Sequence, residues 1–518
     1  MVVAQSHIRA VERMPALPSP LVIRDWKQVA VDYDAFVFDF ERRGDFLPVI
    51  WWDCTKRNFP RDTFGLYSYV GSMHQGKGEN HEAINCLAAV LGATLVGIDK
   101  SKQQGHNWVL MCENYFNRRN GENLFLNKTD ARSGNSFWYE LFTHILMYGL
   151  IDYYPNQGNF VEEMKITAEK WYEAAQVMAQ IPDFNYTAFD FRTRRPVYNG
   201  RWREPDGACG IAWVQYMAYV RFGDPKYLEA ATWALDYLQE QTKNPYYEVL
   251  LPYGALVAAR MNKEQGTNYD VAKFLNWCCD GDSQCRPGWG VVTERWGAVD
   301  CHGLTGSLTD GGGYAFAMNS FQSVAALVPL VRYAPQFARA IGKWMLNVAS
   351  NARLFYANFH GHDRQTCWFW QGDPEHVIPY EGLRKEWDGK SPYATGDPLR
   401  YSWGAIDLCL YAGSHVGMLG GLMGKTNVDG VLQWDCLKTD FFGDKTYGTF
   451  LYYNPHAVEQ TIEIDLGSGL YHLYDLVQES FIEKNVSERG HLILGPDAAS
   501  VVVVIPVAGR DCGEEKGV

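Results

Sequence analysis

Two kinds of helical segment alternate along the middle of this sequence, and the alternation limits how the chain can fold. The clearest pair covers residues 208–241: a nearly all-apolar stretch, CGIAWVQYMAYVRFG, precedes PKYLEAATWALDYLQEQ, whose polar side carries Lys226 and Glu229. A helix that is apolar all round must be buried, whereas an amphipathic helix covers a core with one face. The pattern predicts a double-layered helical barrel, or toroid, in which each inner helix is wrapped by an outer one.

Helical periodicity extends from about residue 81 to about residue 350 and returns in GAIDLCLYAGSHVGMLGGLM. No strict repeat of fixed period accompanies it, which argues against a regular solenoid. Before residue 80 the chain is expected to begin with a poorly ordered arm, and AFVFDF and FLPVIWWD predict strands or irregular segments. Residues 351–402 interrupt the helices with a long loop rich in Pro, Gly, Trp and acidic residues, a composition typical of functional loops.

The pattern changes again near Val428. Short β-branched or alternating runs such as GTFLYYN, VEQTIEIDL and SVVVVIP are separated by turns and predict antiparallel strands. The fold class expected is therefore mainly α with a β-domain: an (α/α)6-type helical toroid followed by a small C-terminal antiparallel β-sandwich. The expected domains are residues 1–80, 81–425 and 426–510.

Composition narrows the classes of partner. The net charge is −13 with no basic stripe, which argues against nucleic acid because binding to nucleic acid depends on neutralising phosphates. The first residues lack an apolar run of signal-peptide length and no later run could span a membrane, so the chain as given is expected to be cytoplasmic, or secreted or periplasmic if a signal peptide was removed. An oligomeric state is left open.

The cysteines and histidines do not predict a metal centre. The 12 Cys are scattered and match no paired zinc pattern. His360, His362 and Asp363 in FHGHDR could hold zinc, but such a set arises by chance often, and we predict neither a metal nor a cofactor. Walker, GxGxxG and GxSxG motifs with the required context are lacking, which leaves little support for nucleotide binding or esterase chemistry.

The segment Gly288–Gln322 concentrates the residue types that act on sugars. It is rich in Gly, which permits positive φ and close approach to a ligand, and it leads into an apolar helix after Tyr314. Aromatic residues make up 14% of the chain, and Trp and Tyr offer flat faces on which sugar rings stack. The segment predicts a shaped loop that carries chemistry on a sugar-like substrate. A second candidate loop, residues 56–82, carries Arg61, His74, Lys77, Glu79 and Glu82.

The architecture resembles the (α/α)-barrel carbohydrate-active enzymes. The resemblance rests on the helix pair described above and on the terminal unit YYNPHAVEQTIEIDLGSGLYHLYDL, and it covers roughly residues 80–507. That group includes glycoside hydrolases and polysaccharide lyases, so the resemblance implies a saccharide substrate. It places the chain in no single family and transfers no catalytic residues.

Hydrolysis of a glycosidic bond needs a proton donor and a carboxylate that acts as base or nucleophile, and we predict an inverting pair. The candidates for catalytic carboxylates are, in order, Asp310, Asp300, Glu294 and Asp206. Asp310 precedes three Gly and has no evident structural task, whereas Asp206 could simply cap the helix that follows it.

The candidates for substrate contact lie in the same loops and in residues 351–423. Among them, the four Trp residues are expected to line a cleft. The candidates are His302, Arg295, Trp289, Trp296, Tyr314, Asn319, Glu204, Trp368, Trp370, Glu381, Asp397, Arg400 and His415.

Two alternatives remain open at this stage. A lyase acting on a uronate by β-elimination needs a Tyr or His base and a group that neutralises the carboxylate, which His302, Tyr314, Asn319 and Arg295, or His415 with Tyr411 and Arg400, could supply. A non-catalytic saccharide-binding protein would use the same aromatic cleft. His415 lies within an apolar helix, where a histidine is more often part of the core.

Overall fold

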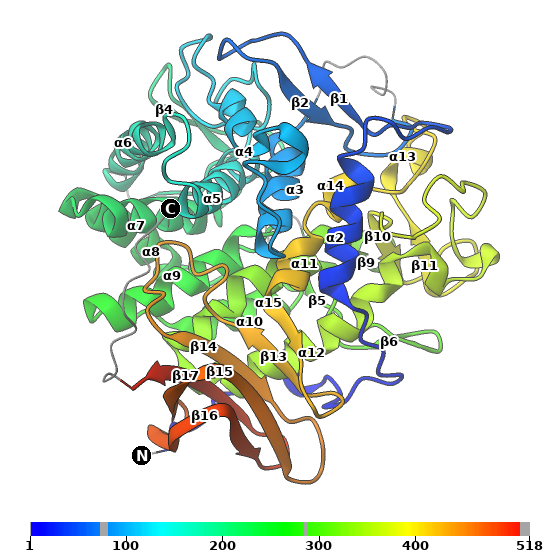
Figure 1. Ribbon diagram of the computed structural model, residues 1–518. Coiled ribbons are helices and arrows are strands. Elements are labelled where there is room, and N and C mark those ends of the chain that lie inside the picture. The colour runs from blue at the N-terminus through cyan, green and yellow to red at the C-terminus, as the bar shows by residue number, and fades with distance from the viewer. Residues whose placement is uncertain (1, 73–80, 182, 284–286, 508–518) are drawn as a thin grey trace.

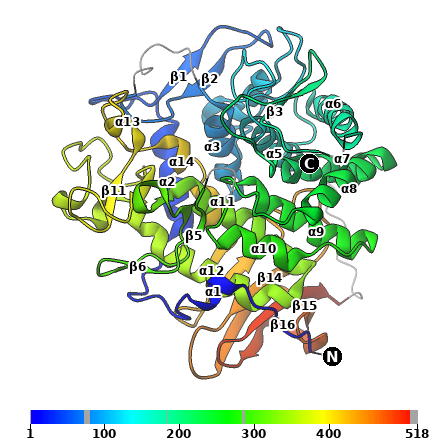
Figure 2. The same ribbon diagram turned by 180° about the vertical axis from the view of Figure 1, so that it is seen from behind.

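The computed structural model describes residues 2–72, 81–181, 183–283 and 287–507. Helices fill the body of the molecule, a small hairpin lies at one end, and an antiparallel sheet formed by the last part of the chain lies at the other (Figures 1 and 2). Within these residues no helix is both long enough and apolar enough to cross a membrane.

Six helices of the described chain pack in a closed circuit. Each contacts the next in sequence order, and the last returns to the first. Gly92 and Gly417 allow this closure, because a Cβ on Gly417 would lie 2.3 Å from the carbonyl oxygen of Gly92. We call the six the inner helices: α3 (Ala83–Leu95), α5 (Phe137–Tyr153), α7 (Gly207–Phe222), α9 (Leu250–Gln265), α11 (Ala317–Leu327) and α15 (Val416–Leu422).

Amphipathic helices cover the inner helices from outside. The predicted pair at residues 208–241 is confirmed: α7 ends at Gly223 with φ +71°, and the Asp224 side chain accepts a hydrogen bond from the Lys226 N–H to begin the next helix. The outer helices, each packed on at least one inner helix, are α2 (Trp26–Val37), α6 (Phe160–Ala179), α8 (Pro225–Glu240), α10 (Val271–Cys279) and α12 (Ala338–Asn351).

The N-terminal region differs from the prediction of a poorly ordered arm followed by strands or irregular segments. Residues Trp26–Val37 form α2, which packs on α15, and Asp25 caps it by accepting from the Gln28 N–H. The run AFVFDF alternates when it is considered alone, but it continues a helical stripe of buried residues that starts at Trp26. The preceding residues are also packed: Ile8 and Val11, the latter in α1 (Arg9–Glu12), are fully buried. Of the runs expected to be strands or irregular segments, FLPVIWWD contains β1 (Ile50–Asp53), which pairs with β2 (Thr63–Leu66) from the second candidate loop.

The segment around Gly288–Gln322 is a sheet more than a loop. Three of its stretches pair antiparallel with two from the later loop in the order β11-β10-β9-β8-β5. This sheet leads directly into α11. Its strands are β5 (Trp289–Val291), β8 (Thr305–Ser307), β9 (Tyr314–Phe316), β10 (Gly382–Arg384) and β11 (Tyr393–Thr395).

Short elements complete this part of the chain. Two hairpins and three single-turn helices connect the longer elements. They are β3 (Ala188–Asp190) with β4 (Arg195–Val197), β6 (Arg295–Trp296) with β7 (Val299–Asp300), and α4 (Trp108–Met111), α13 (Asp397–Arg400) and α14 (Leu410–Gly413).

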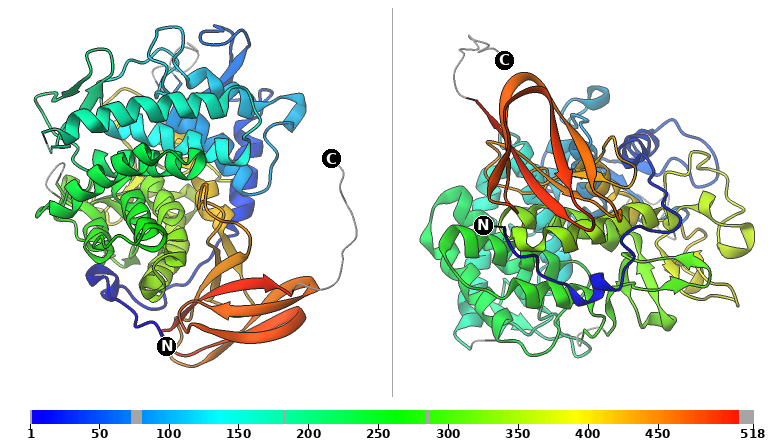
Figure 3. Two further views of the ribbon diagram at one scale, coloured as in Figure 1. Left: turned by 90° about the vertical axis from the view of Figure 1, so that its left-hand side faces the viewer. Right: turned by 90° about the horizontal axis from the view of Figure 1, so that it is seen from below.

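The C-terminal strands form one continuous antiparallel sheet in place of the two facing sheets of the expected sandwich. Its order is β12-β13-β14-β17-β15-β16, and register shifts between Asp465 and Tyr474 interrupt the longest strand. The sheet, coloured orange to red, lies below the helical body in the left view of Figure 3. It has a small core of its own and packs on α12 through β14 and β17. Its strands are β12 (Met423–Lys425), β13 (Leu432–Asp435), β14 (Gly448–Tyr453), β15 (Gln460–Asp475), β16 (Ser480–Leu494) and β17 (Ala499–Pro506).

Residues 436–447, between β13 and β14, cover the C-terminal ends of the inner helices, and we call them the closing loop. Its Lys438 ammonium donates to the carbonyl of Leu95, the last residue of α3, and Thr439 donates to the carbonyl of Ala325 near the end of α11. Cationic and hydroxyl donors suit these ends, where carbonyl groups lack helical partners.

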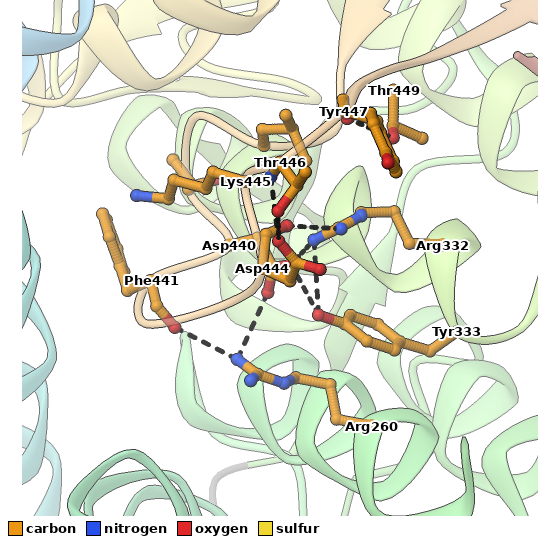
Figure 4. Close-up of polar contacts among 12 residues, drawn as sticks. Arg260, Arg332, Tyr333, Asp440, Phe441, Asp444, Lys445, Thr446, Tyr447 and Thr449 are labelled. Atoms are coloured by element: carbon orange, nitrogen blue, oxygen red, sulfur yellow. Dashed lines mark hydrogen bonds and ion pairs between the residues drawn. The ribbon is translucent and has the colours of Figure 1, made fainter. Parts of the chain in front are cut away.

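The buried carboxylate of Asp440 anchors the closing loop. It accepts hydrogen bonds from Arg260 of α9 at 3.3 Å, from Tyr333 at 2.6 Å and from Arg332, and these side chains point toward it in Figure 4. Arg260 also donates to the carbonyl of Phe441 at 3.1 Å. The loop is thereby fixed to two neighbouring parts of the helical body.

Candidate functional site

A cavity of about 840 Å³ lies at the N-terminal ends of inner helices, at the end opposite the closing loop. Glu82 immediately precedes α3, Trp138 and Asn319 lie in the first turns of α5 and α11, and Glu248 comes two residues before α9. Helix N-termini present free N–H groups and a positive dipole end, which favours negative charge nearby. Five lining side chains carry carboxyl groups: Glu82, Glu248, Asp310, Glu381 and Asp397.

Glu381 is the most constrained of these carboxylates. The hydroxyl groups of Tyr69 and Tyr314 donate to its two oxygens at 2.7 Å each, and the Asp397 N–H donates at 2.8 Å. The five-stranded sheet β11-β10-β9-β8-β5, which we call the mouth sheet, creates this geometry, because Glu381 directly precedes β10 and Tyr314 lies in the adjacent β9. Burial and the neighbouring Asp397 charge raise the pKa of Glu381 to about 7, although the tyrosine hydrogen bonds oppose the rise.

Glu248 has a contrasting environment. It adopts φ +60°, uncommon for a residue with a side chain, and no hydrogen bond from the described residues reaches its carboxyl group. Burial, followed by the charges of Glu204 and Glu381, raises the pKa of Glu248 well above its ordinary value. A carboxyl group in this setting keeps its proton at neutral pH.

Glu204 and Asp206 lie behind the cavity wall and are buried. Glu204 accepts from the Trp138 N–H at 2.8 Å and from the indole N–H of Trp202 at 3.0 Å, so it positions two aromatic residues that line the cavity. Asp206 accepts from the Tyr247 N–H at 2.9 Å, and its side chain makes no capping hydrogen bond to α7. Burial and the charges of Glu204 and Glu248 raise the pKa of Asp206 well above its usual range.

A charged group surrounds Asp310 at the cavity wall. Arg384 lies 3.8 Å from Asp310 and 3.9 Å from Asp397, and Arg400 lies 3.9 Å from Asp310. Asp310 precedes three Gly with φ of +58°, +88° and +135°, a path that only Gly follows readily. Burial raises the pKa of Asp397, and Arg384 and Arg400 partly offset that rise.

Five sequence-predicted residues line the cavity. Two further predicted residues contact lining carboxylates: Tyr314 donates a hydrogen bond to Glu381, and Arg400 lies 3.9 Å from Asp310. The five are Asp310, Trp289, Asn319, Glu381 and Asp397.

Asp300 and Glu294 are not among the lining residues. Asp300 is buried against the N-terminal arm, where it accepts from the Ser19 N–H at 3.0 Å and contacts His302 at 2.7 Å. Glu294 pairs with Lys385 at 2.8 Å beside the buried Trp296, and Arg295 is exposed. The proposed lyase group of His302, Arg295, Tyr314 and Asn319 is therefore not assembled around this cavity.

The remaining predicted residues also lie elsewhere. Trp368 is half exposed and stacks on His362 beside a separate small pocket, which Trp370 also lines. His415 is fully buried, where it contacts Gln322 at 2.6 Å and stacks on Phe142. Of the second candidate loop, Glu82 lines the cavity and Arg61 pairs with Glu113, whereas His74, Lys77 and Glu79 lie outside the described residues.

Sequence reasoning missed several lining residues because they lie inside or next to helical stretches. Glu248 and Tyr247 are in YYEVLLPYGALVAARMN, and Trp138 is in SFWYELF, both of which predict only helix. One sequence signal could have found two of the lining residues: Glu82 and Glu248 are both acidic residues that come just before an apolar helical stretch. The other missed lining side chains include Tyr69, Tyr139, Trp202, Tyr401 and Trp403, whereas Tyr411, named above for the lyase alternative, does line the cavity.

Metal-ligating side chains do not cluster here: in the part of the chain that the structure describes, no three His, Cys, Asp or Glu residues could together hold an ion.

Comparisons with known proteins give only remote likenesses. No family profile and no curated protein matches the chain. Among solved structures, a GH127 β-L-arabinofuranosidase from Geobacillus stearothermophilus is 12% identical, with 94% of this chain and 81% of that chain covered and a TM-score of 0.32. A D-mannose isomerase is 9% identical, with 76% and 97% covered and a TM-score of 0.36. An Anoxybacillus α-amylase is 14% identical, with 21% of this chain and only 25% of that chain covered and a TM-score of 0.13. These TM-scores are too low to carry an argument about function.

Proposed function

We propose that this protein is a glycoside hydrolase in which Glu248 is the general acid and Glu381 the general base. The observation that carries the proposal is that both carboxyl groups line one aromatic cavity but differ in the number of hydrogen-bond donors that reach them. Glu381 receives three donors, which favour its ionised form, and Glu248 receives none from the described residues. Environments that separate the protonation states of two carboxyl groups in this way suit an acid–base pair.

The reaction uses the two groups on opposite sides of one bond. Glu248 gives its proton to the glycosidic oxygen, which leaves with the electron pair of the breaking C1–O bond. Glu381 takes a proton from water as the water oxygen bonds to C1, so one water is consumed and one new hydroxyl forms on each product. We also propose inversion at C1, in which the attacking water lies between the two carboxyl groups on the face of the sugar opposite the leaving oxygen.

The cavity favours a neutral substrate over a uronate. Five carboxyl groups line it, and Arg201 is the single Arg or Lys among its described lining residues. An acidic sugar would meet repulsion there, whereas hydroxyl groups can donate to carboxylates. Trp138, Trp202, Trp289 and Trp403 supply aromatic faces for sugar rings.

We also propose that the inner and outer helices form an (α/α)6-type toroid, with residues 81–425 as the catalytic unit and the C-terminal sheet as its support. The closed circuit of packed inner helices favours this description. Four of the inner helices, α3, α5, α9 and α11, have residues at their N-terminal ends in the cavity lining, as expected of a site built at one end of a toroid.

The test is incubation with a panel of neutral and acidic glycans. A hydrolase releases reducing ends without a near-ultraviolet chromophore, and proton NMR of the first product shows the anomer opposite to that of the substrate. An unsaturated, ultraviolet-absorbing product would make the protein a lyase. Binding without any product would make it a saccharide-binding protein, and either result would refute the proposal.

A further inference from the structure

A layer of four buried side chains that contact one another backs the inner end of the cavity. Gln322 accepts from the Tyr253 hydroxyl at 2.6 Å, and its amide nitrogen contacts His415 Nδ1 at 2.6 Å. Phe142 stacks on His415 with ring centroids 5.7 Å apart. All four side chains are at most 2% exposed, and they come from α5, α9, α11 and the residue before α15. We call this layer the plate.

The plate lies one helical turn deeper than the cavity. Phe142 follows Trp138 by four residues, Gln322 follows Asn319 by three, and His415 follows Tyr411 by four, so each pair lies on one face of its helical segment. Below the plate, Phe441 of the closing loop packs near Trp213 at 6.3 Å between ring centroids. In the described residues the cavity therefore ends inside the helical body.

Three donors at the closed end lack partners. The indole N–H of Trp138, the amide nitrogen of Asn319 and the hydroxyl of Tyr411 are buried atoms with no hydrogen bond, and all three residues line the cavity. Leaving a buried donor unsatisfied destabilises a protein, so such atoms in a native site call for a ligand or water. Their shared complement is a compact molecule with several acceptor oxygens.

We propose that the enzyme acts only at chain ends, with the terminal sugar bound at the closed end by Trp138, Asn319 and Tyr411. This inference rests on the proposed function. The plate stops a chain from passing through, so only a terminal ring reaches the three donors, and its hydroxyl oxygens accept from them. The bond cut is then the one that links this terminal sugar to the next unit.

The first experiment compares substrates with free and blocked ends. Oligosaccharides that the glycan panel shows to be cleaved are labelled at the reducing end, and bulky groups are placed on the non-reducing ring, on the reducing end, or on both. We expect each cleavage to release one sugar and a bulky group at one of the two ends to abolish cleavage. The end whose modification abolishes cleavage is the end that enters the cavity. Internal products, or unchanged cleavage with both ends blocked, would overturn the inference while leaving the hydrolase intact.

The second experiment tests the three donors. Tyr411→Phe and Asn319→Ala are expected to lower kcat/KM by about 10- to 100-fold each. Tyr447→Phe, which changes a half-exposed ring in the closing loop, is the matched control and should have no effect. A donor contact also predicts that Tyr411→Phe loses the discrimination between the natural terminal sugar and the monodeoxy analogue that lacks the contacted hydroxyl. A variant that is weaker but keeps that discrimination would show a structural role and refute the contact.

Binding to Glu381→Gln separates the two proposals if cleavage is absent. Free-ended oligosaccharides should bind this variant and doubly blocked ones should not, as measured by tryptophan fluorescence. Equal binding of both would refute the chain-end inference alone. Absence of both cleavage and binding for every glycan would remove the proposed function and this inference together.

Discussion

The Tyr69 hydroxyl donates a 2.7 Å hydrogen bond to Glu381, although 312 positions separate the two residues. Tyr314 donates to the other carboxylate oxygen, and its own ring lies under Arg384, whose guanidinium carbon is 3.8 Å from the ring centroid. The orientation of Glu381 is thus set by the N-terminal region and by the mouth sheet together. A base held on both oxygens loses little entropy when it meets its water.

Glu381→Gln and Glu248→Gln should each lower kcat by ~10²–10⁴-fold, because each removes one half of the acid–base pair and keeps nearly the same shape. Glu294→Gln is the matched control, since Glu294 pairs with Lys385 outside the cavity. Initial rates on a cleaved glycan, together with circular dichroism of each variant, give the comparison. Near-normal rates in either cavity variant would transfer its role to Asp310 or Asp397.

The pH profile should report Glu381. The base must be ionised, so kcat/KM should fall tenfold per unit as pH drops below about 7, the pKa to which burial and Asp397 raise Glu381. Glu248 must keep its proton, so activity should fall again at a higher pH. The rate measured across the pH range should give this bell shape.

Asp397→Asn should move the acidic side of that profile to lower pH. The substitution removes the charge that raises the pKa of Glu381, so the ionised base persists into more acidic solution. Asp388→Asn, in an exposed turn with φ +49°, is the matched control because Asn also tolerates that conformation. An unchanged acidic side in Asp397→Asn would show that another group titrates there.

Asp300→Asn should affect stability more than catalysis. Burial alone would raise the pKa of Asp300, but hydrogen bonds from His302 and the Ser19 N–H outweigh it and lower the pKa to about 2. A carboxylate with a depressed pKa stabilises the fold above its unfolded pKa, an amount of about 2 kcal/mol here. Urea unfolding should show this loss at pH 7 and a smaller one as pH falls from 4 toward 2. A loss independent of pH would contradict the ionic explanation.

Asp440→Asn should destabilise the protein by ~1–3 kcal/mol, because it removes a charged acceptor from the buried Arg260 and leaves Glu264, at 3.4 Å, as its remaining carboxylate partner. Asp444→Asn, an exposed substitution four residues further along the closing loop, provides the control. Thermal unfolding followed by circular dichroism measures both. Equal midpoints in the two variants would show that the Asp440 contacts contribute nothing measurable.

Helical periodicity was the most reliable guide in the sequence. It located α7 and α8 and the change to strands near Val428, because the spacing of buried apolar residues differs between helices and strands and can be seen within a short stretch of sequence. It failed for Trp26–Val37, where a short alternating run concealed a longer helical stripe. The single sheet at the C-terminus was also not readable, because strand order depends on pairing between distant segments.

The candidate site was only partly predictable for a related reason. Asp310, Glu381 and Asp397 stand in Gly- and Pro-rich loops, a local signal, and all three line the cavity. Asp300 and His302 gave the same signal and do pair with each other, but against the N-terminal arm. Glu248 gave no loop signal, because it adjoins an apolar helical stretch and the sequence pattern assigns it to that helix. Only the structure shows that its backbone is not helical, with φ +60°.

The closing loop imposes an order on the folding of the molecule during its synthesis. Its contacts with Leu95, Ala325 and Arg260 join helices made early to residues 436–447, which leave the ribosome after every inner helix. Until then the C-terminal carbonyl groups of α3 and the charge of Arg260 must remain in water. The C-terminal ends of the inner helices therefore stay uncovered until the segment between β13 and β14 has been made, and a chain truncated before residue 436 lacks this closure.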